Sequence, residues 1–213
     1  MLKVINFSKK FSGELIISIP SLELKSGVYW IKGENGAGKT TFFRSLAGLI
    51  PCEGNVEFQD GISLKRFPIK YRERVSYAEA EPLYPGFLTS NDLIHFVADA
   101  RKSPRSQQRI LIKRFGVDQY FEKPCATYSS GMLKKLSLVL AFLGAPKLII
   151  LDEPLITLDE RAQEILIDIV DEYIREHEAT ILVSSHQFLE NTKMRIHETF
   201  VIKDKSLLTL NPS

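Results

Sequence analysis

The sequence has little of several features that mark specialised classes of protein. Its two cysteines, Cys52 and Cys125, have no metal-binding or redox spacing, so we interpret them as unpaired thiols in a reducing compartment. The longest apolar run, residues 138–145, is far shorter than the roughly 18 residues of a membrane span, and residues 1–6 become polar too soon for a signal peptide. The net charge of +2, without a long basic run, does not indicate a nucleic-acid-binding surface. We therefore expect a cytoplasmic protein with no membrane span of its own and no nucleic-acid partner.

What the chain does contain is a phosphate-binding pattern. Residues 33–40, Gly-Glu-Asn-Gly-Ala-Gly-Lys-Thr, fit G-x-x-x-x-G-K-[ST]. The apolar residues 28–31 before them predict a buried strand, and residues 41–49 after them predict a helix that ends at Gly48. A glycine-rich turn would match by chance in roughly 1% or fewer of chains of this length, since glycine is about 7% of residues. Strand, glycine loop and helix form the context that nucleotide binding requires.

The chemistry of this loop follows from its residue types. Glycines let successive backbone N–H groups turn toward a phosphate, and the following helix adds the N–H groups of its first turn. Lys39 would reach the β- and γ-phosphates, and the Thr40 hydroxyl would hold Mg²⁺. We therefore predict a nucleotide-binding site formed by Asn35, Gly36, Ala37, Gly38, Lys39, Thr40 and Thr41.

Two later strands are predicted to bring polar groups to the same edge of a sheet. One buried apolar run is followed by Asp152 and Glu153, and a second is followed by His186. Asp152 would support the Mg²⁺ that Thr40 holds, and Glu153 would orient or deprotonate the attacking water. His186 would sense the γ-phosphate by hydrogen bonding. The alternatives are an ordinary loop that starts at Asp152 and a structural histidine.

The N-terminal segment predicts an antiparallel pair of strands. Residues 2–7 and 14–19 have the apolar pattern of strands, with Gly13 in the turn between them and Pro20 ending the second. Phe11 precedes the turn. It is either a platform for a purine ring or an ordinary aromatic residue at the end of a strand.

Three consecutive helices are predicted between residues 89 and 143, and Thr89 and Asp92 resemble a capping box at the start of the first. The expected buried faces are Leu93, Phe96, Val97 and Ala100 in the first helix and Ile110, Leu111 and Phe115 in the second. We therefore expect an α/β fold, with a largely parallel sheet flanked by helices, an N-terminal antiparallel β subdomain and a helical insert. We predict a single domain over residues 1–213, with the helical subdomain at about 87–145.

Together these motifs resemble those of an ATP-binding cassette (ABC) ATPase, the nucleotide-binding subunit of an ABC transporter, over about residues 1–210. Residues 33–40 resemble the Walker A motif of its P-loop NTPase core. Residues 148–153 resemble the Walker B motif, which ends in the catalytic glutamate, here Glu153. His186 resembles the switch histidine, and Phe11 is similar in position to the aromatic residue that stacks on adenine.

Two segments depart from the family pattern. Residues 128–132, Tyr-Ser-Ser-Gly-Met, stand where the family has its signature L-S-G-G-Q, so that Ser129 and Gly131 match while the second glycine and the glutamine are replaced. In the family this segment covers ATP bound to a partner subunit, which implies that Ser129 and Gly131 contact nucleotide across a head-to-tail dimer with weakened closure. Ala80 stands where the family has a glutamine that contacts Mg²⁺ and the attacking water, which implies less efficient turnover.

The resemblance implies an enzyme that binds ATP and Mg²⁺ and hydrolyses ATP to power transport. The implied partners are a separate transmembrane permease subunit and a second ABC ATPase subunit, and the implied location is peripheral, on the inner face of the membrane. Residues 81–85, Glu-Pro-Leu-Tyr-Pro, followed by Leu88-Thr89, are more similar to exporter-type than to importer-type cassettes. The alternative is a soluble or weakly hydrolytic regulatory module that binds nucleotide.

Overall fold

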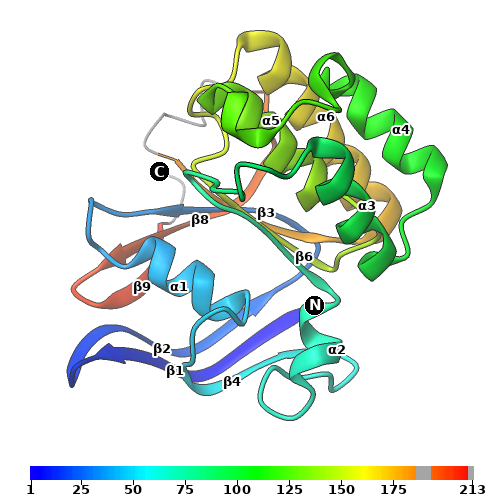
Figure 1. Ribbon diagram of the computed structural model, residues 1–213. Helices are drawn as coiled ribbons and strands as arrows, with labels where there is room; N and C mark the ends of the chain where they lie inside the picture. Colours follow the sequence, from blue (N-terminus) through cyan, green and yellow to red (C-terminus); the bar gives the residue numbers. More distant parts are fainter. Residues whose placement is uncertain (186–192, 211–213) are drawn as a thin grey trace.

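The computed structural model describes residues 1–185 and 193–210. Over these residues the chain builds one mixed sheet with the strand order β4–β1–β2–β9–β8–β3–β7–β6–β5 (Figure 1). The strands are β1 Leu2–Phe11, β2 Glu14–Leu24, β3 Gly27–Lys32, β4 Glu53–Phe58, β5 Val75–Ala78, β6 Leu148–Asp152, β7 Thr180–Ser184, β8 Ile196–Lys203 and β9 Ser206–Leu210. The predicted α/β class, with a parallel part and an N-terminal antiparallel part, is confirmed.

The parallel part of the sheet contains β8, β3, β7, β6 and β5. β6 and β7 are buried along their whole length, which explains why their sequences are continuous apolar runs rather than alternating ones. Their register pairs Asp152 with Ser184. The carboxyl ends of these strands therefore meet at one edge of the sheet, where the predicted polar groups lie.

The antiparallel part consists of β1 with its neighbours β2 and β4, and β9 pairs antiparallel with β8. The prediction that Pro20 ends the second strand is wrong, because β2 continues beyond it. β1 and β2 pair on both sides of Pro20 but not at Pro20 itself, opposite which Asn6 has a left-handed φ of 48°. On its other edge β2 meets β9 at Ser18 and Ser206. Pro20 therefore lies at a position where its missing N–H breaks no ladder hydrogen bond.

Helices cover both faces of the parallel strands (Figure 1). They are α1 Lys39–Leu46, α2 Pro68–Arg72, α3 Ser90–Arg101, α4 Arg105–Arg114, α5 Ser130–Ala141 and α6 Glu160–His177. None of these described helices combines the length and the apolar character that crossing a bilayer would need.

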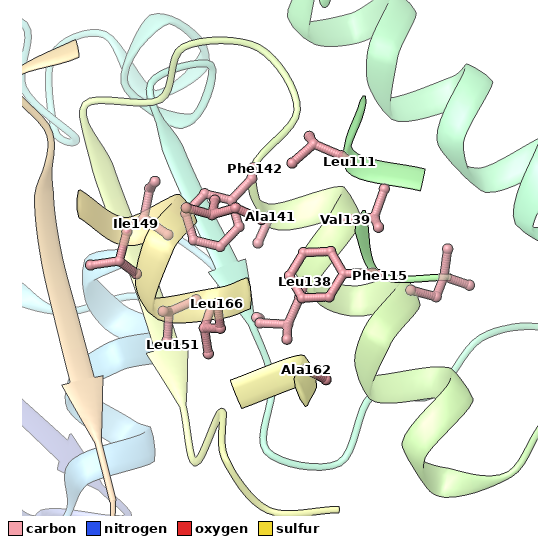
Figure 2. Close-up of a cluster of buried hydrophobic side chains, with 14 of the residues drawn as sticks. Leu111, Phe115, Leu138, Val139, Ala141, Phe142, Ile149, Leu151, Ala162 and Leu166 are labelled. Atoms are coloured by element: carbon pink, nitrogen blue, oxygen red, sulfur yellow. The ribbon is translucent and has the colours of Figure 1, made fainter. Parts of the chain in front are cut away.

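Alternate side chains of β6 point into two separate hydrophobic clusters. Leu148 and Ile150 belong to the cluster on the α1 side, and Ile149 and Leu151 belong to the cluster beneath α3–α6. Figure 2 shows the second cluster, in which Ile149 and Leu151 lie near Leu166 of α6 and side chains of α5. Because the strand is anchored on both faces, the position of its last residue is firmly set.

The predicted buried faces of the first two helices are each partly wrong. In α3, Phe96 is 75% exposed and Ala100 is exposed, whereas Ile94 and Ala98 are buried. In α4, Ile110 is 56% exposed, while the other two predicted residues are buried. Each helix carries apolar residues on two overlapping stripes, and packing against α5 and its neighbours determines which stripe is buried.

Candidate functional site

A cavity of about 300 Å³ lies where β3 and β6 end. Most of its wall comes from residues that the sequence predicts to bind or hydrolyse nucleotide. The lining residues are Phe11, Ile16, Asn35, Gly36, Gly38, Lys39, Thr40, Thr41, Ala80, Asp152 and Glu153. Ala37, also predicted to bind nucleotide, does not line this cavity, and its side chain packs against the hydrophobic cluster on the α1 side.

The loop between β3 and α1 adopts backbone conformations that favour glycine. Gly36 has a φ of 81° and Gly38 a φ of 104°. A Cβ at Gly38 would lie 3.1 Å from Ile16 Cγ2, so a side chain there would press against the cavity wall. Gly38 caps α1 without a side-chain hydrogen bond, and the first turn of α1 carries no acidic residue. The N–H groups and positive dipole end of α1 are therefore suited to an anion.

Lys39 is folded back over its own loop. Its side chain is buried, and Nζ donates to Gly33 O at 2.7 Å and to Glu34 O at 3.1 Å. An ammonium has three N–H donors. It can therefore exchange these carbonyl acceptors for phosphate oxygens without leaving the loop.

The Asp152 carboxylate joins three other elements of the fold. Oδ2 accepts a hydrogen bond from Thr40 Oγ1 at 2.8 Å and another from the Tyr77 hydroxyl at 3.1 Å. Oδ1 accepts from Ser184 Oγ at 2.5 Å. These bonds connect the end of β6 to the start of α1, to β5 and to β7. The carboxylate is consequently held in one orientation beside the phosphate-binding loop.

Glu153 stands immediately after this anchored carboxylate. Its backbone has a left-handed φ of 48°, which is uncommon for a residue with a side chain and is found more often at functional sites. Its N–H donates to Ser184 Oγ at 3.0 Å, so the same serine fixes both acidic residues. The side chain of Glu153 is buried and lines the cavity together with Lys39 and Thr40.

Phe11 lies at the end of β1, on the rim of the cavity. Its ring is 48% exposed, and Lys9 Nζ lies 4.5 Å from the ring centroid. A half-exposed aromatic face at the mouth of a phosphate-binding cavity is suited to stack on a nucleobase. Phe11 lines the same cavity as the phosphate-binding loop, and its role as a platform for a purine ring stays a prediction.

Ser129 and Gly131 lie apart from this group, in a second cavity of about 650 Å³ at the start of α5. Ser129 Oγ caps α5 by accepting from Met132 N at 3.2 Å. A Cβ at Gly131 would lie 2.9 Å from Thr157 O. Within one chain these two residues are therefore not brought together with the phosphate-binding loop. His186, the other predicted catalytic residue, lies outside the described residues.

Sequence reasoning missed three polar side chains around Asp152, namely those of Tyr77, Lys134 and Ser184. Burial, together with the nearby Asp152, raises the pKa of Tyr77, so its hydroxyl stays protonated and can donate. Burial lowers the pKa of Lys134 to about 8, although nearby carboxylates act in the opposite direction. One signal was visible in the sequence, because Lys134 stands one helical turn before the apolar Leu138 in a segment predicted to be helical.

The oxygen atoms in the cavity fit Mg²⁺ in an ATP site. A hydroxyl and a carboxylate, those of Thr40 and Asp152, meet beside the loop, and Mg²⁺ is typically bound by one or two carboxylates plus substrate phosphates. Among residues 1–185 and 193–210, no cluster of three or more His, Cys, Asp and Glu residues could hold a metal ion.

Known proteins share both the sequence and the fold. A family profile described as ABC transporter matches residues 19–156. The chain is 30% identical over 204 residues to the cytochrome c biogenesis ATP-binding export protein CcmA of Legionella pneumophila, covering 93% of this chain and 98% of that protein.

Two solved structures resemble the whole fold. One, described as the ATP binding subunit of an ABC transporter, superimposes with a TM-score of 0.88 and 25% identity, covering 99% of this chain and 90% of that one. The other, a dimeric ATP-binding cassette in a post-hydrolysis state bound to ADP and Pi, has a TM-score of 0.83 and 17% identity over 100% of both chains. The family profile covers more than half of the chain. The chain therefore belongs to the ABC transporter family, as an ATP-binding subunit and an ATPase.

Proposed function

We propose that this chain binds ATP with Mg²⁺ in the cavity lined by Lys39 and Glu153 and hydrolyses it to drive transport through a separate permease. The observation that carries the proposal is the 2.8 Å hydrogen bond between Thr40 Oγ1 and Asp152 Oδ2. These two residues are 112 positions apart in the sequence. They bring two oxygen ligands of the kind that Mg²⁺ prefers to the start of a helix that is suited to phosphate.

Different residues at the cavity have different roles in ATP binding and hydrolysis. Lys39 and the first N–H groups of α1 bind the β- and γ-phosphates, and Phe11 stacks on the adenine. Glu153 accepts a proton from the attacking water, because it is the buried carboxylate next to Asp152, which would hold the metal. Bound Mg²⁺ supplies neutralisation of charge on the phosphate oxygens. Thr40 and Asp152 would hold it there, with Tyr77 and Ser184 keeping the carboxylate oriented.

We also propose that the active form is a head-to-tail dimer of single-domain chains. Residues 1–213 form the domain, and α3, α4 and α5 form its helical subdomain at about 87–145. In the dimer, Ser129 and Gly131 of one copy contact the nucleotide on the other. Their separation from the phosphate-binding loop of their own chain supports this arrangement, as does the dimeric state of one structural neighbour. His186 follows β7 by two residues, close in sequence to Ser184, and would stabilise the transition state.

The transporter is proposed to be of the exporter type, with this chain bound peripherally to a permease on the cytoplasmic face of the membrane. Two observations support the direction: the similarity of residues 81–89 to exporter-type cassettes and the description of the Legionella relative as an export protein. Purification of the chain from its own cells in mild detergent should recover a polytopic membrane protein. In vesicles containing both proteins, cargo should move away from the side that holds ATP. Movement toward the ATP side would overturn the export proposal.

The experiment that tests the hydrolytic role is the substitution Glu153→Gln. The amide keeps the size of the side chain but cannot take a proton from water, so turnover should fall on the order of 100-fold or more. ATP affinity, measured by calorimetry, should stay close to that of the wild type. Glu164→Gln, an exposed acid on α6, is the matched control and should hydrolyse ATP normally. Wild-type turnover in Glu153→Gln would remove Glu153 from the mechanism.

A further inference from the structure

Lys134 is a cation in the interior of the protein. It lies on α5 with 1% of its surface exposed. Its ammonium donates to Ala80 O at 2.6 Å, to Glu79 O at 2.9 Å and to Asp152 O at 3.4 Å. These three carbonyls match its three N–H donors. Because an unpaired buried charge is strongly unfavourable, the position of Lys134 depends on all three acceptors staying in place.

The three carbonyls belong to two walls of the phosphate cavity. Glu79 and Ala80 follow β5, and Asp152 is the last residue of the adjacent strand β6. Ala80, Asp152 and Glu153 all line the cavity. Ala80 contributes no polar side chain there, so the loop after β5 is held through its main chain. One ammonium thus fixes the distance between the loop and the end of β6.

The same helix is also tied to the chain that follows β6. Near its start, a Cβ at Gly131 would lie 2.9 Å from Thr157 O, and Lys135 Nζ lies 2.5 Å from Asp159 Oδ2. The buried Lys134 lies between Gly131 and Lys135 on this helix and connects it to the end of β6. A displacement of α5 would therefore reach the main chain of Asp152 and of Ala80 through Lys134.

We infer that Lys134 is a positioning residue for ATP hydrolysis, which sets the main chain of Ala80 and Asp152 relative to each other and couples both to α5. The inference rests on the proposed function of the cavity. It predicts that removing the ammonium misplaces Asp152 and Glu153 while leaving the phosphate-binding loop intact. Nucleotide binding and turnover should then separate.

Arg101 provides a control for stability. It is a half-buried cation on α3, and it donates to Val75 O at 3.1 Å and to Leu140 O at 3.3 Å. Like Lys134, it holds neighbouring elements together through main-chain carbonyls, in this case α3 to α5 and to β5. None of its described acceptors lines the phosphate cavity. Substitution of Arg101 should therefore destabilise the fold without changing the site.

The test compares Lys134→Met with Arg101→Met in the full chain, at a temperature where circular dichroism shows both to be folded. Lys134→Met should lower kcat on the order of 100-fold, as expected for a small misplacement of reacting groups, with KM and ATP affinity within about threefold of wild type. Arg101→Met should keep kcat within about threefold. Lys134→Arg retains a cation with several donors and should recover at least about tenfold of the activity that methionine loses. If Lys134→Met does not fold, Lys134→Gln, which keeps two donors, takes its place.

Several results would overturn the inference: a kcat near wild type in Lys134→Met, an equal loss in Arg101→Met, or a loss of ATP affinity as large as the loss of kcat. Absence of hydrolysis by the wild type would count against the proposed function instead. Amide hydrogen exchange would then test whether Lys134 couples α5 to the main chain of Ala80 and Asp152. Residues 79–86 and 130–134 should exchange faster in Lys134→Met than in Arg101→Met, and equal rates in the two variants would contradict the coupling.

Discussion

The cavity beside the phosphate-binding loop and the cavity at the start of α5 differ in how their polar groups are held. In the phosphate cavity, of about 300 Å³, the Asp152 carboxylate accepts hydrogen bonds from side chains on α1, β5 and β7. In the α5 cavity, of about 650 Å³, Ser129 Oγ accepts a hydrogen bond from the main chain three residues away. At the first site one carboxylate joins side chains from distant parts of the sequence, whereas at the second the Ser129 hydroxyl bonds within the start of its own helix.

This difference supports the proposal that the first cavity binds nucleotide within one chain, and that the second contributes to the site of a partner chain. Oriented ligands that need no rearrangement are what a catalytic metal and phosphate site requires. A helix start with one capping serine offers N–H groups to an anion but cannot enclose it. We therefore expect substitutions in the phosphate cavity to impair the chain that carries them. Substitutions in the α5 cavity should instead impair turnover on the partner chain.

The largest effect is expected for Asp152→Asn. The amide nearly keeps the shape of the side chain but removes the charge that would hold Mg²⁺, and its NH₂ group would meet hydroxyl donors. Turnover should fall on the order of 10²–10³-fold at every Mg²⁺ concentration tested. The exposed Asp168→Asn on α6 serves as the control. Turnover like that of the wild type in Asp152→Asn at limiting Mg²⁺ would show that this carboxylate is not a ligand.

A smaller effect is expected for Ser129→Ala in the α5 cavity. Loss of one hydrogen bond to a charged phosphate should lower turnover about tenfold, or ~1.4 kcal/mol, without changing the ATP affinity of dilute chains. The helix also loses its cap, so Thr89→Ala, which removes the cap of α3, is the matched control for stability. Equal turnover in the two variants would mean that Ser129 is a cap and nothing more.

Much of the fold and of the phosphate cavity is predictable from local patterns. A few residues suffice to predict the glycine loop at 33–40 and the buried strand that ends at Asp152. The capping box of Thr89 and Asp92 is also present as predicted. Parallel pairing then brings the strand ends together, so the meeting of Thr40 with Asp152 follows from topology. These features depend on short segments and on one general rule.

Other features depend on packing between distant segments, and they were not predictable. Whether Phe96 or Ile94 is buried is determined by where α5 lies against α3. The partners of Lys134 are main-chain carbonyls 54, 55 and 18 residues away, and carbonyl positions leave no trace in the amino-acid sequence. A lysine one helical turn before the apolar Leu138 was the one available sign.

The measurement that tests this comparison most directly is the mass of the Glu153→Gln variant in solution, with and without ATP and Mg²⁺, by sedimentation. Because this variant should bind ATP without hydrolysing it, the account predicts a single chain without nucleotide and a pair of chains with it. Addition of Ser129→Ala should weaken the pairing. The contradicting result has two parts. The Glu153→Gln variant would stay a single chain although it is saturated with ATP, and the wild type would hydrolyse ATP at the same low protein concentration. Together these would exclude a site that needs both cavities.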